Sequence, residues 1–330
     1  MRMRALQDLG HEIIPLDTSP PRVERKWKRV LPRLLNKLGY PPDLAGTNAR
    51  ICEIAEREQP DVLWIDKGLT IKPTTLLYIK KMCLSTMIVS YSPDDMAQPH
   101  NHSHAYLRAI PLYDVHFTTK TYNIEELSAL RARRVIFVGN AYDPHTHRPL
   151  LVSERDRILL GGMVGFIGAF EKDRAQQMLA LTQAGISVRI WGWGDWSRWR
   201  GKHSNLEVEN QPLWGDEYAR AICSFDINLG FLRKMNRDRQ TTRSVEIPAC
   251  GGFMLAERTD EHLDLFEEGR EAEFFGSTGE LIEKVRFYLK HEDLRKKIAQ
   301  AGRERCLRSR YDYSSRMRWM LEQVASLYSA

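Results

Sequence analysis

The sequence predicts an α/β protein of two domains, each built on a mostly parallel sheet. Three observations lead to this prediction. The chain has 330 residues, where a domain takes about 150. Short apolar runs alternate with helical patterns along most of it. Hydrophobic residues make up 42% of the chain and charged residues 28%, a balance that allows two buried cores. Parallel sheets of this kind bind ligands beyond the carboxyl ends of their strands.

The first domain is expected to span residues 1–150. Its strands are predicted from five short apolar runs, at residues 11–16, 61–65, 86–90, 115–118 and 134–138. Because helix-length segments separate these runs, the strands should lie parallel and be covered by helices on both faces.

A basic, amphipathic segment lies between the first two predicted strands. Apolar residues recur there at helical spacing, at Val23, Trp27, Val30, Leu31, Leu34, Leu35 and Leu38. Residues 22–37 also carry seven basic side chains and one acidic side chain. We interpret the segment as a helix packed on the first sheet with a solvated basic face. A helix lying at a membrane surface is the alternative.

The second domain is expected to span residues 151–311, after a polar, proline-interrupted stretch. Its predicted strands lie at residues 163–167, 187–191, 226–229 and 252–256. From residue 277 onward the pattern is helical, with apolar stripes at Leu281, Val285, Tyr288, Leu294 and Ile298. The last stripe belongs to a helix at residues 313–328.

Charge, cysteine spacing and hydropathy exclude several classes of protein. The net charge of +6 is patchy, and no nucleic-acid-binding motif accompanies it, so we expect no nucleic-acid partner. The five cysteines are far apart and form no CxxC pair, which disfavours a disulfide framework and a structural zinc site. No apolar run approaches the roughly 20 residues of a membrane span, and the start lacks a signal-peptide pattern. A cytoplasmic protein is the prediction.

The residues between two predicted strands at 238–252 are those of an anion-binding turn. Thr241 or Thr242 is placed to begin a helix, whose free backbone N–H groups and positive dipole end would attract a phosphate. Arg243 adds a fixed cation, and Glu246 is spaced to accept hydrogen bonds from a ribose diol. An ion pair between Arg243 and Glu246 on the helix surface is an equal alternative.

The same segment, TTRSVEIPACGGFML from Thr241 to Leu255, followed by Glu257, Arg258 and Thr259, resembles the CgeB-like glycosyltransferases. These are relatives of the GT-B family of retaining, nucleotide-sugar-dependent enzymes. The resemblance implies two Rossmann-like domains facing across a cleft, with residues 312–330 forming a helix that returns to the first domain. It also implies that two acidic residues eight positions apart frame the donor site. Asp238 and Glu246 match this pair, with Asp where Glu is commoner.

A second donor element is suggested by a strand followed by a turn of small residues, Gly168, Ala169 and Phe170. Glycine lets a phosphate approach the backbone, and Lys172 or Arg174 would neutralise its charge. Taken alone, the pattern is that of an ordinary turn from strand to helix. The resemblance makes Arg174 the stronger donor-binding candidate and Lys172 the weaker.

Aromatic residues gather near the end of the strand predicted at 187–191. Trp191 and Trp193 are placed to stack on a base or a sugar face, and Tyr218 begins a helix at the same sheet edge. Packing within a wide loop is the alternative for all three, and the favoured one for Tyr218.

In the first domain, Asp94 and Asp95 directly follow a strand. Either is a candidate general base or acceptor ligand, and capping of a turn is the alternative for both. Lys67 occupies the equivalent place after a neighbouring strand. The chain contains no Asp-x-Asp motif, and its histidines outside the strands lie in polar loops, so we predict no required metal.

These observations predict a glycosyltransferase that uses a nucleoside-diphosphate sugar as donor, with no other cofactor. The resemblance implies a retaining reaction. The acceptor stays open, with a cell-surface polysaccharide precursor and a lipid-linked glycan as options, and with peripheral contact at the inner face of a membrane allowed. A non-catalytic nucleotide-sugar-binding protein and a sugar-nucleotide epimerase of the same fold are the alternatives.

One expectation concerns the beginning of the chain. Residues 4–12 have the pattern of a helix end, a glycine terminator and a strand, so Met1 falls inside a helix. In the family that the chain resembles, a first strand and a glycine-containing loop precede that helix. We therefore expect that the natural start lies upstream.

Overall fold

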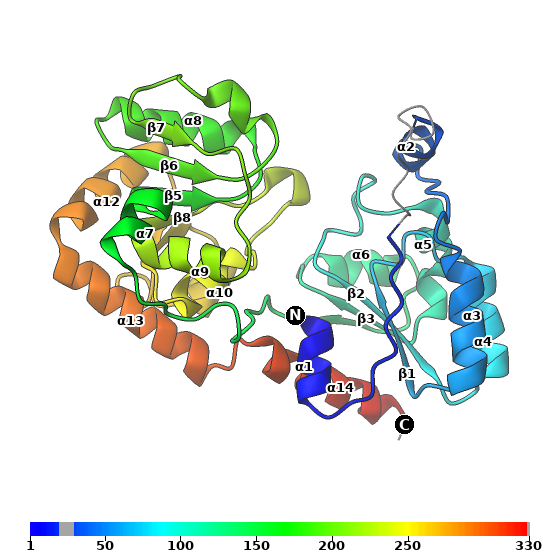
Figure 1. The fold of residues 1–330 in the computed structure, drawn as a ribbon. Helices are drawn as coiled ribbons and strands as arrows, with labels where there is room; N and C mark the ends of the chain where they lie inside the picture. Colours follow the sequence, from blue (N-terminus) through cyan, green and yellow to red (C-terminus); the bar gives the residue numbers. More distant parts are fainter. Residues whose placement is uncertain (20–29, 329–330) are drawn as a thin grey trace. The chain divides into compact units, whose positions relative to one another are not determined.

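The structure, a computed structural model, describes residues 1–19 and 30–328, which form two compact units (Figure 1). Residues 2–139 and the chain from Met317 onward make up the first unit, and residues 140–316 make up the second. The chain thus passes between the units at residues 139–140 and again at 316–317, where the sequence suggested 150 and 311.

The first unit holds a four-stranded parallel sheet in the order β1-β2-β3-β4. Its strands are β1 (Val62–Asp66), β2 (Met87–Ser92), β3 (Val115–Thr118) and β4 (Val135–Phe137). All four were predicted. The strand predicted at residues 11–16 is wrong, because this segment has no regular structure. Pro15 cannot donate a ladder hydrogen bond, and the neighbouring polar residues offer no apolar face to bury.

Helices cover both faces of this sheet. The helices of this unit are α1 (Arg2–Asp8), α2 (Val30–Lys37), α3 (Thr47–Glu58), α4 (Pro73–Met82), α5 (His104–Ala109), α6 (Asn123–Ala129) and α14 (Tyr313–Tyr328), with a 3₁₀ turn at Ile110–Leu112; α2 does not take part in covering the sheet. One face packs Ile65 and Ile88 against α3 and α4. Near the opposite face, the guanidinium of Arg2 lies over the Tyr91 ring and pairs with Asp66.

Helix α14 returns to the first unit, as expected. From Met317 onward it groups with this unit, and it buries Met317, Met320 and Val324 almost completely. Near its end, the Tyr328 hydroxyl donates to the carbonyl oxygens of Asp61 and Ser85, which precede β1 and β2.

The expectation that residues 22–38 pack on the sheet is wrong for the described part of that segment. Helix α2 buries none of its eight residues. Val30, Leu31, Leu34 and Leu38 are all more than half exposed. Val23 and Trp27 lie outside the described residues.

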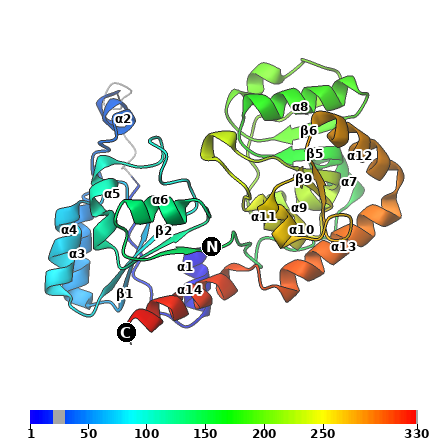
Figure 2. The same cartoon turned by 180° about the vertical axis from the view of Figure 1, so that it is seen from behind.

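The second unit holds a six-stranded parallel sheet in the order β10-β9-β8-β5-β6-β7. Figure 2 shows β5, β6 and β9 of this sheet from behind. Its strands are β5 (Gly162–Ile167), β6 (Val188–Trp191), β7 (Leu206–Val208), β8 (Phe225–Gly230), β9 (Met254–Glu257) and β10 (Glu273–Phe275). The sequence did not predict β7 and β10, because each has three residues of which one is a glutamate, whereas the equally short β4 is entirely apolar. In β10 the buried Glu273 is also compensated from a distance, by Lys284 and the Tyr288 hydroxyl.

The helices of the second unit are α7 (Glu154–Leu160), α8 (Lys172–Gln183), α9 (Gly215–Ser224), α10 (Arg243–Ala249), α11 (Asp260–Leu265), α12 (Thr278–Lys290) and α13 (Glu292–Arg308), with 3₁₀ turns at Asp195–Trp199 and Lys234–Asn236. One core forms between the sheet and α8, α12 and the first half of α13. The other contains residues of α9, α10 and α11, with Cys306 from the end of α13. This layering brings the starts of α8 and α10 to the carboxyl edge of the sheet. No described helix is long and apolar enough to span a bilayer.

His116 on β3 makes the stability of the first unit depend on pH. It is buried, Nε2 donates to the Ile110 carbonyl at 3.0 Å, and Nδ1 has no partner. Burial lowers the pKa of His116 to about 4. Between pH 6.5 and 4 the unfolded chain therefore binds a proton that the folded chain does not, so stability present above pH 6.5 is lost as the pH falls.

We expect this histidine to account for a loss of roughly 3 kcal/mol in the free energy of unfolding of the first unit between pH 7 and 4. Urea unfolding of the wild type and of His116→Gln across this range measures it. The variant should show a flatter pH dependence, whereas His100→Gln, at an exposed position, should follow the wild type. Equal slopes for the wild type and His116→Gln would contradict the assignment.

Candidate functional site

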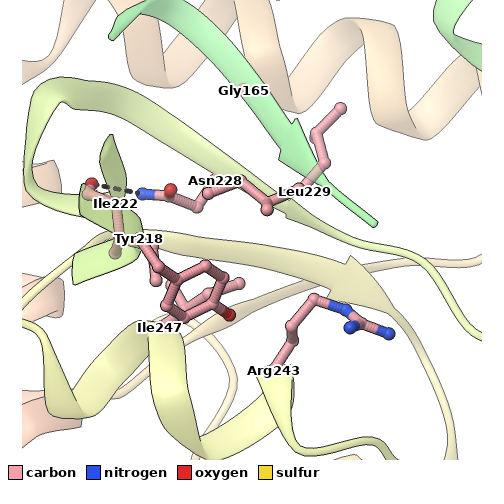
Figure 3. Close-up of a pocket in the computed structure, with 8 residues that line it drawn as sticks. Gly165, Tyr218, Ile222, Asn228, Leu229, Arg243 and Ile247 are labelled. Atoms are coloured by element: carbon pink, nitrogen blue, oxygen red, sulfur yellow. Dashed lines mark hydrogen bonds between the residues drawn. The ribbon is translucent and has the colours of Figure 1, made fainter. Parts of the chain in front are cut away.

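The candidate site lies at the carboxyl edge of the six-stranded sheet, where β5 and β8 end beside α9 and α10. A small cavity opens there, lined by Gly165, Ile167, Tyr218, Ile222, Asn228, Leu229, Arg243 and Ile247 (Figure 3). Its volume of about 10 Å³ holds no more than one water molecule. A larger ligand would therefore lie over this edge, against the polar groups that surround the cavity.

Arg243 is the first residue of α10, and its side chain extends from the helix beside the ring of Tyr218 (Figure 3). Its Nε atom is buried without a hydrogen-bond partner, and within the described residues the side chain makes no ion pair. The surface ion pair with Glu246 that the sequence allowed is therefore not formed. Arg243 keeps an unused set of donors at the sheet edge.

Arg174, on the first turn of α8, is the second cation of the site. It is only 2% exposed, with Nε donating to the Leu232 carbonyl at 3.3 Å and Nη1 to the Ala169 carbonyl at 3.1 Å. Its Nη2 has no hydrogen-bond partner, and the nearest carboxylate oxygen, on Glu171, is 4.0 Å away. Carbonyl oxygens thus orient the guanidinium but do not neutralise it.

Positive charge accumulates around Arg174. Burial is the main cause that lowers its pKa to about 10; the neighbouring Arg243 and Arg233 act in the same direction, and Glu171 and Glu257 oppose them. Glu171 is shared, because Arg233 Nε also lies 3.1 Å from its carboxylate. Glu257, the other carboxylate near Arg174, pairs with Lys234. The cations around Arg174 therefore outnumber the carboxylates, which favours an anionic ligand.

Glu246 is held by two partners from separate elements. The Tyr218 hydroxyl donates to Oε2 at 2.7 Å, and His147 Nε2 lies 3.8 Å from Oε1. The Nδ1 atom of His147 accepts the Asp143 backbone N–H at 3.0 Å, which leaves the proton of the neutral ring on Nε2, facing Glu246. Burial lowers the pKa of His147, so the neutral ring is favoured. From the sequence, His147 was one of the polar-loop histidines and was expected to be exposed, but the fold buries it beside α10.

The start of α10 differs from the expected anion-binding turn. Thr242 is the N-cap residue, but the N–H groups of Ser244, Val245 and Glu246 already donate to the Thr241 and Thr242 carbonyls. The Thr241 N–H donates to the Ser244 hydroxyl. The helix begins after Thr242, as expected, but among the described residues only the N–H groups of Thr242 and Arg243 are left without a bond, fewer than an anion-binding turn would offer. Side chains carry the positive charge here.

Asp238 does not frame the site in the way that the sequence suggested. Its Oδ1 accepts the Asn236 amide at 2.8 Å and its Oδ2 accepts the Arg233 N–H at 3.4 Å. Both oxygens therefore close the loop between β8 and α10. Glu246 is the member of the acidic pair that reaches the site.

The turn at residues 168–170 is hydrogen-bonded to the end of β6 and to the residues that follow it. The Gly168 N–H donates to the Trp191 carbonyl at 2.8 Å, the Phe170 N–H donates to the Trp193 carbonyl at 3.1 Å, and the indole of Trp196 donates to the Gly168 carbonyl at 2.9 Å. This turn positions the Ala169 carbonyl on Arg174. Lys172, at the start of α8, is exposed and makes no hydrogen bond or ion pair with Arg174 or its neighbours among the described residues.

The two candidate tryptophans are placed differently. Trp191 is 3% exposed and its indole donates to the Leu160 carbonyl, so its ring is part of the core and not open to a ligand. Trp193 is half exposed and lies 5.7 Å from the exposed Trp214, with the rings tilted by 41°. Trp193 and Trp214 therefore form an open aromatic pair.

The two candidate bases of the first unit, Asp94 and Asp95, differ in exposure. Asp95 is fully buried, and its Oδ1 accepts the Asn123 amide at 2.9 Å and the Ala97 N–H at 3.3 Å, so it stabilises its loop and cannot reach a substrate. Asp94 is partly exposed and pairs with Lys67. Of the two proposed bases, Asp94 is the accessible one. Within the described residues no cluster of His, Cys, Asp or Glu could hold a metal ion.

Comparison with known proteins identifies the fold. Residues 174–322 match the family described as glycosyl transferase-like, which is just under half of the chain. No curated protein sequence matches it. The fold is GT-B, with two Rossmann-like parallel-sheet domains, as predicted.

Three solved structures illustrate this likeness. HepE from Anabaena, in complex with UDP and glucose, has a TM-score of 0.61 at 14% identity, covering 85% of this chain and 81% of HepE. Further HepE structures hold UDP or UDP-glucose. Sucrose-phosphate synthase from Thermosynechococcus elongatus has a TM-score of 0.66 at 11% identity, covering 96% and 83%. A Listeria monocytogenes structure assigned as a UDP-N-acetylglucosamine 2-epimerase has a TM-score of 0.54 at 14% identity, and the match covers 95% of this chain and 82% of that one.

The close approach of the turn at residues 168–170 to the end of β6 requires a glycine at position 192. A Cβ atom at this position would lie 1.9 Å from the Gly168 carbonyl oxygen, so the backbone itself must move. We expect Gly192→Ala to lower the free energy of unfolding of the second unit by about 1 to 3 kcal/mol. Gly279→Ala, where the nearest atom is 3.9 Å away, should cost nothing. Urea unfolding of both variants checks this, and a Gly192→Ala protein as stable as the wild type would contradict it.

Proposed function

We propose that this protein is a GT-B glycosyltransferase whose second unit binds a nucleoside-diphosphate sugar. The observation that supports this most directly is the pair Arg174 and Arg243, each with a buried guanidinium nitrogen that no described group satisfies. A diphosphate would supply both the negative charge and the acceptor oxygens, in a geometry that guanidinium groups match. The family match over residues 174–322 supports the same ligand class.

The neighbouring groups suggest how the rest of the donor would bind. Glu246, oriented by Tyr218 and His147, would accept the ribose hydroxyls. The exposed Trp193 and Trp214 would give the base or sugar an aromatic face. Since the HepE structures hold UDP and UDP-glucose, these are the ligands to test first.

The proposed reaction is glycosyl transfer. The bond from the anomeric carbon to the β-phosphate oxygen breaks, and its electron pair leaves with the diphosphate. An acceptor hydroxyl oxygen forms the new bond to that carbon. If configuration is retained, its proton passes to the departing phosphate oxygen and no protein base is needed. Arg243 and Arg174 would stabilise the charge on the leaving group, so no metal is invoked.

The acceptor is assigned to the first unit as part of this proposal. Lys67 and Asp94 follow β1 and β2 and are the accessible charged groups among the candidates there. In an inverting reaction Asp94 would serve as the base. The CgeB-like subtype and the cytoplasmic location stay predictions from the sequence.

A sugar-nucleotide epimerase is the second candidate, favoured by the likeness to the Listeria monocytogenes structure. Incubation with a panel of nucleotide sugars, with and without an acceptor extract, separates the possibilities. A transferase releases nucleoside diphosphate and forms a new glycoside only when acceptor is present. An epimerase converts the donor alone, and a binding protein changes nothing.

The arginine pair predicts a large loss of donor affinity. Arg243→Ala and Arg174→Gln should each weaken UDP binding by roughly tenfold or more, since a charge-assisted hydrogen bond contributes about 1.5 to 3 kcal/mol. Isothermal titration calorimetry measures this. Arg198→Ala is the matched control, because Arg198 is exposed on the same unit and pairs only locally with Asp195. Unchanged UDP affinity in both site variants would exclude the assigned phosphate site.

Glu246 predicts a preference for ribose. The wild type should bind UDP more tightly than 2′-deoxy-UDP, and Glu246→Gln should reduce that preference by about tenfold because the charged acceptor is lost. Competition binding with the two nucleotides gives the ratio. Glu217→Gln, at an exposed position on α9, should keep it. A preference that survives in Glu246→Gln would place the ribose elsewhere.

A further inference from the structure

The first turn of α11 is hydrogen-bonded to the loop that leads into α10. The Thr259 hydroxyl, at the N-cap of α11, donates to the Arg239 carbonyl at 2.6 Å. The Gln240 side-chain amide donates to Glu261 Oε2 at 2.9 Å. Because Gln240 and Glu261 are both buried, this second bond is shielded from water. Together the two bonds hold the loop a few residues before Arg243.

Ser244, the residue after Arg243, makes a third bond to α11. Its hydroxyl lies 2.7 Å from His262 Nε2 and also accepts the Thr241 N–H at 3.0 Å. The other ring nitrogen of His262, Nδ1, lies 2.7 Å from the Glu257 carbonyl oxygen. Since that oxygen can only accept, Nδ1 carries the proton of the neutral ring. Nε2 is therefore an acceptor, and the Ser244 hydroxyl donates to it.

His262 is buried in a fixed orientation. It is 1% exposed, and its ring stacks on Phe274 of β10, with the centroids 5.5 Å apart and the planes 6° apart. Burial lowers the pKa of His262, while the Glu257 carbonyl and the carboxylates of Glu257 and Glu261 act in the opposite direction. The neutral ring is thus favoured. Because Ser244 is also buried, the pair cannot reach a substrate, and any effect on a ligand is exerted through its neighbours.

The neighbour that depends on this bond is Arg243. Its Nε atom is buried without a partner, and no group in residues 1–19 or 30–328 forms an ion pair with it. Arg174, by contrast, is oriented by the carbonyl oxygens of Ala169 and Leu232. The direction in which Arg243 extends is therefore set by the backbone at the start of α10. That backbone is the part of the helix that Ser244 joins to α11.

We propose that His262 is a positioning residue for Arg243. By accepting the Ser244 hydroxyl, it keeps the start of α10 in the orientation that presents the Arg243 guanidinium to a diphosphate. The inference deepens the proposed function and rests on it for the identity of the ligand. It differs from general support of the fold in being selective. Loss of the bond should weaken the phosphate contact of Arg243 and leave that of Arg174.

The first test needs no ligand. It is hydrogen exchange, measured by NMR, in the wild type and in His262→Phe, which keeps a flat ring against Phe274 but has no acceptor. The amides of Thr241 and of residues 244–246 should exchange about tenfold faster in the variant. His262→Gln, whose side-chain oxygen can accept the Ser244 hydroxyl, should restore their protection. His291→Phe, at an exposed histidine of the same unit, should exchange like the wild type.

The second test is a pair of double-mutant cycles, with UDP affinity measured by calorimetry. His262→Phe and Ser244→Ala should each weaken UDP binding by about threefold to tenfold, and His262→Gln should recover most of the loss. In a chain that carries Arg243→Ala, the added His262→Phe should change the affinity by less than about twofold, because the contact is already lost. In a chain that carries Arg174→Gln, it should keep its full effect.

Two results would overturn the proposal. One is unchanged exchange of the amides at the start of α10 in His262→Phe. The other is an equal loss of affinity in the Arg243→Ala and Arg174→Gln chains, which would show a general effect on the fold. Failure of the wild type to bind UDP would instead refute the proposed function. The exchange measurement would still decide whether His262 holds the start of α10 in place.

Discussion

The arrangement of the second unit depends on how the charge of Arg174 is balanced. An isolated guanidinium is costly to bury, and here carbonyl oxygens and a shared carboxylate compensate it only in part. The turn at residues 168–170 is pressed against β6, which aims the Ala169 carbonyl at the guanidinium. Arg243 approaches from α10 and adds to the imbalance. The protein therefore holds a preorganised positive site, and the proposed diphosphate would supply the charge that the folded chain leaves uncompensated.

Around Arg174, uncharged groups set the positions of the site residues, and the charged side chains are left free to contact a ligand. Tyr218 and His147 orient Glu246 without neutralising it, and Trp196 holds the Gly168 carbonyl. This arrangement suits the proposed ligand, which has phosphate groups at one end that need cations and hydroxyl groups at the other that need a hydrogen-bond acceptor. Mutations of the supporting residues should alter affinity through position, and mutations of the arginines should alter it through charge.

The sequence was sufficient for the architecture and for part of the site. Eight strands lie in readable apolar runs and were predicted, including β4 with only three residues. The short strands β7 and β10 were not predicted, because a glutamate falls within each. Arg174, Arg243 and Glu246 were found because they flank strand ends within recognisable motifs. His147 was missed because no local pattern marks it. Trp191 and Asp95 were misjudged because burial depends on packing from distant segments. The exposure of α2 was missed for the same reason, since an amphipathic pattern does not say whether its apolar face finds a partner.

The double passage of the chain between the units has a consequence for biosynthesis. The first unit contains residues 2–139 but also the part of α14 from Met317 onward, whose methionines are buried in it. During translation the whole of residues 140–316 is made before that helix is available. The second unit is continuous and can fold as soon as it is complete, while the first still lacks the helix that buries Met317, Met320 and Val324 in it. Although its amino-terminal part is synthesised first, the first unit is therefore the last to be completed.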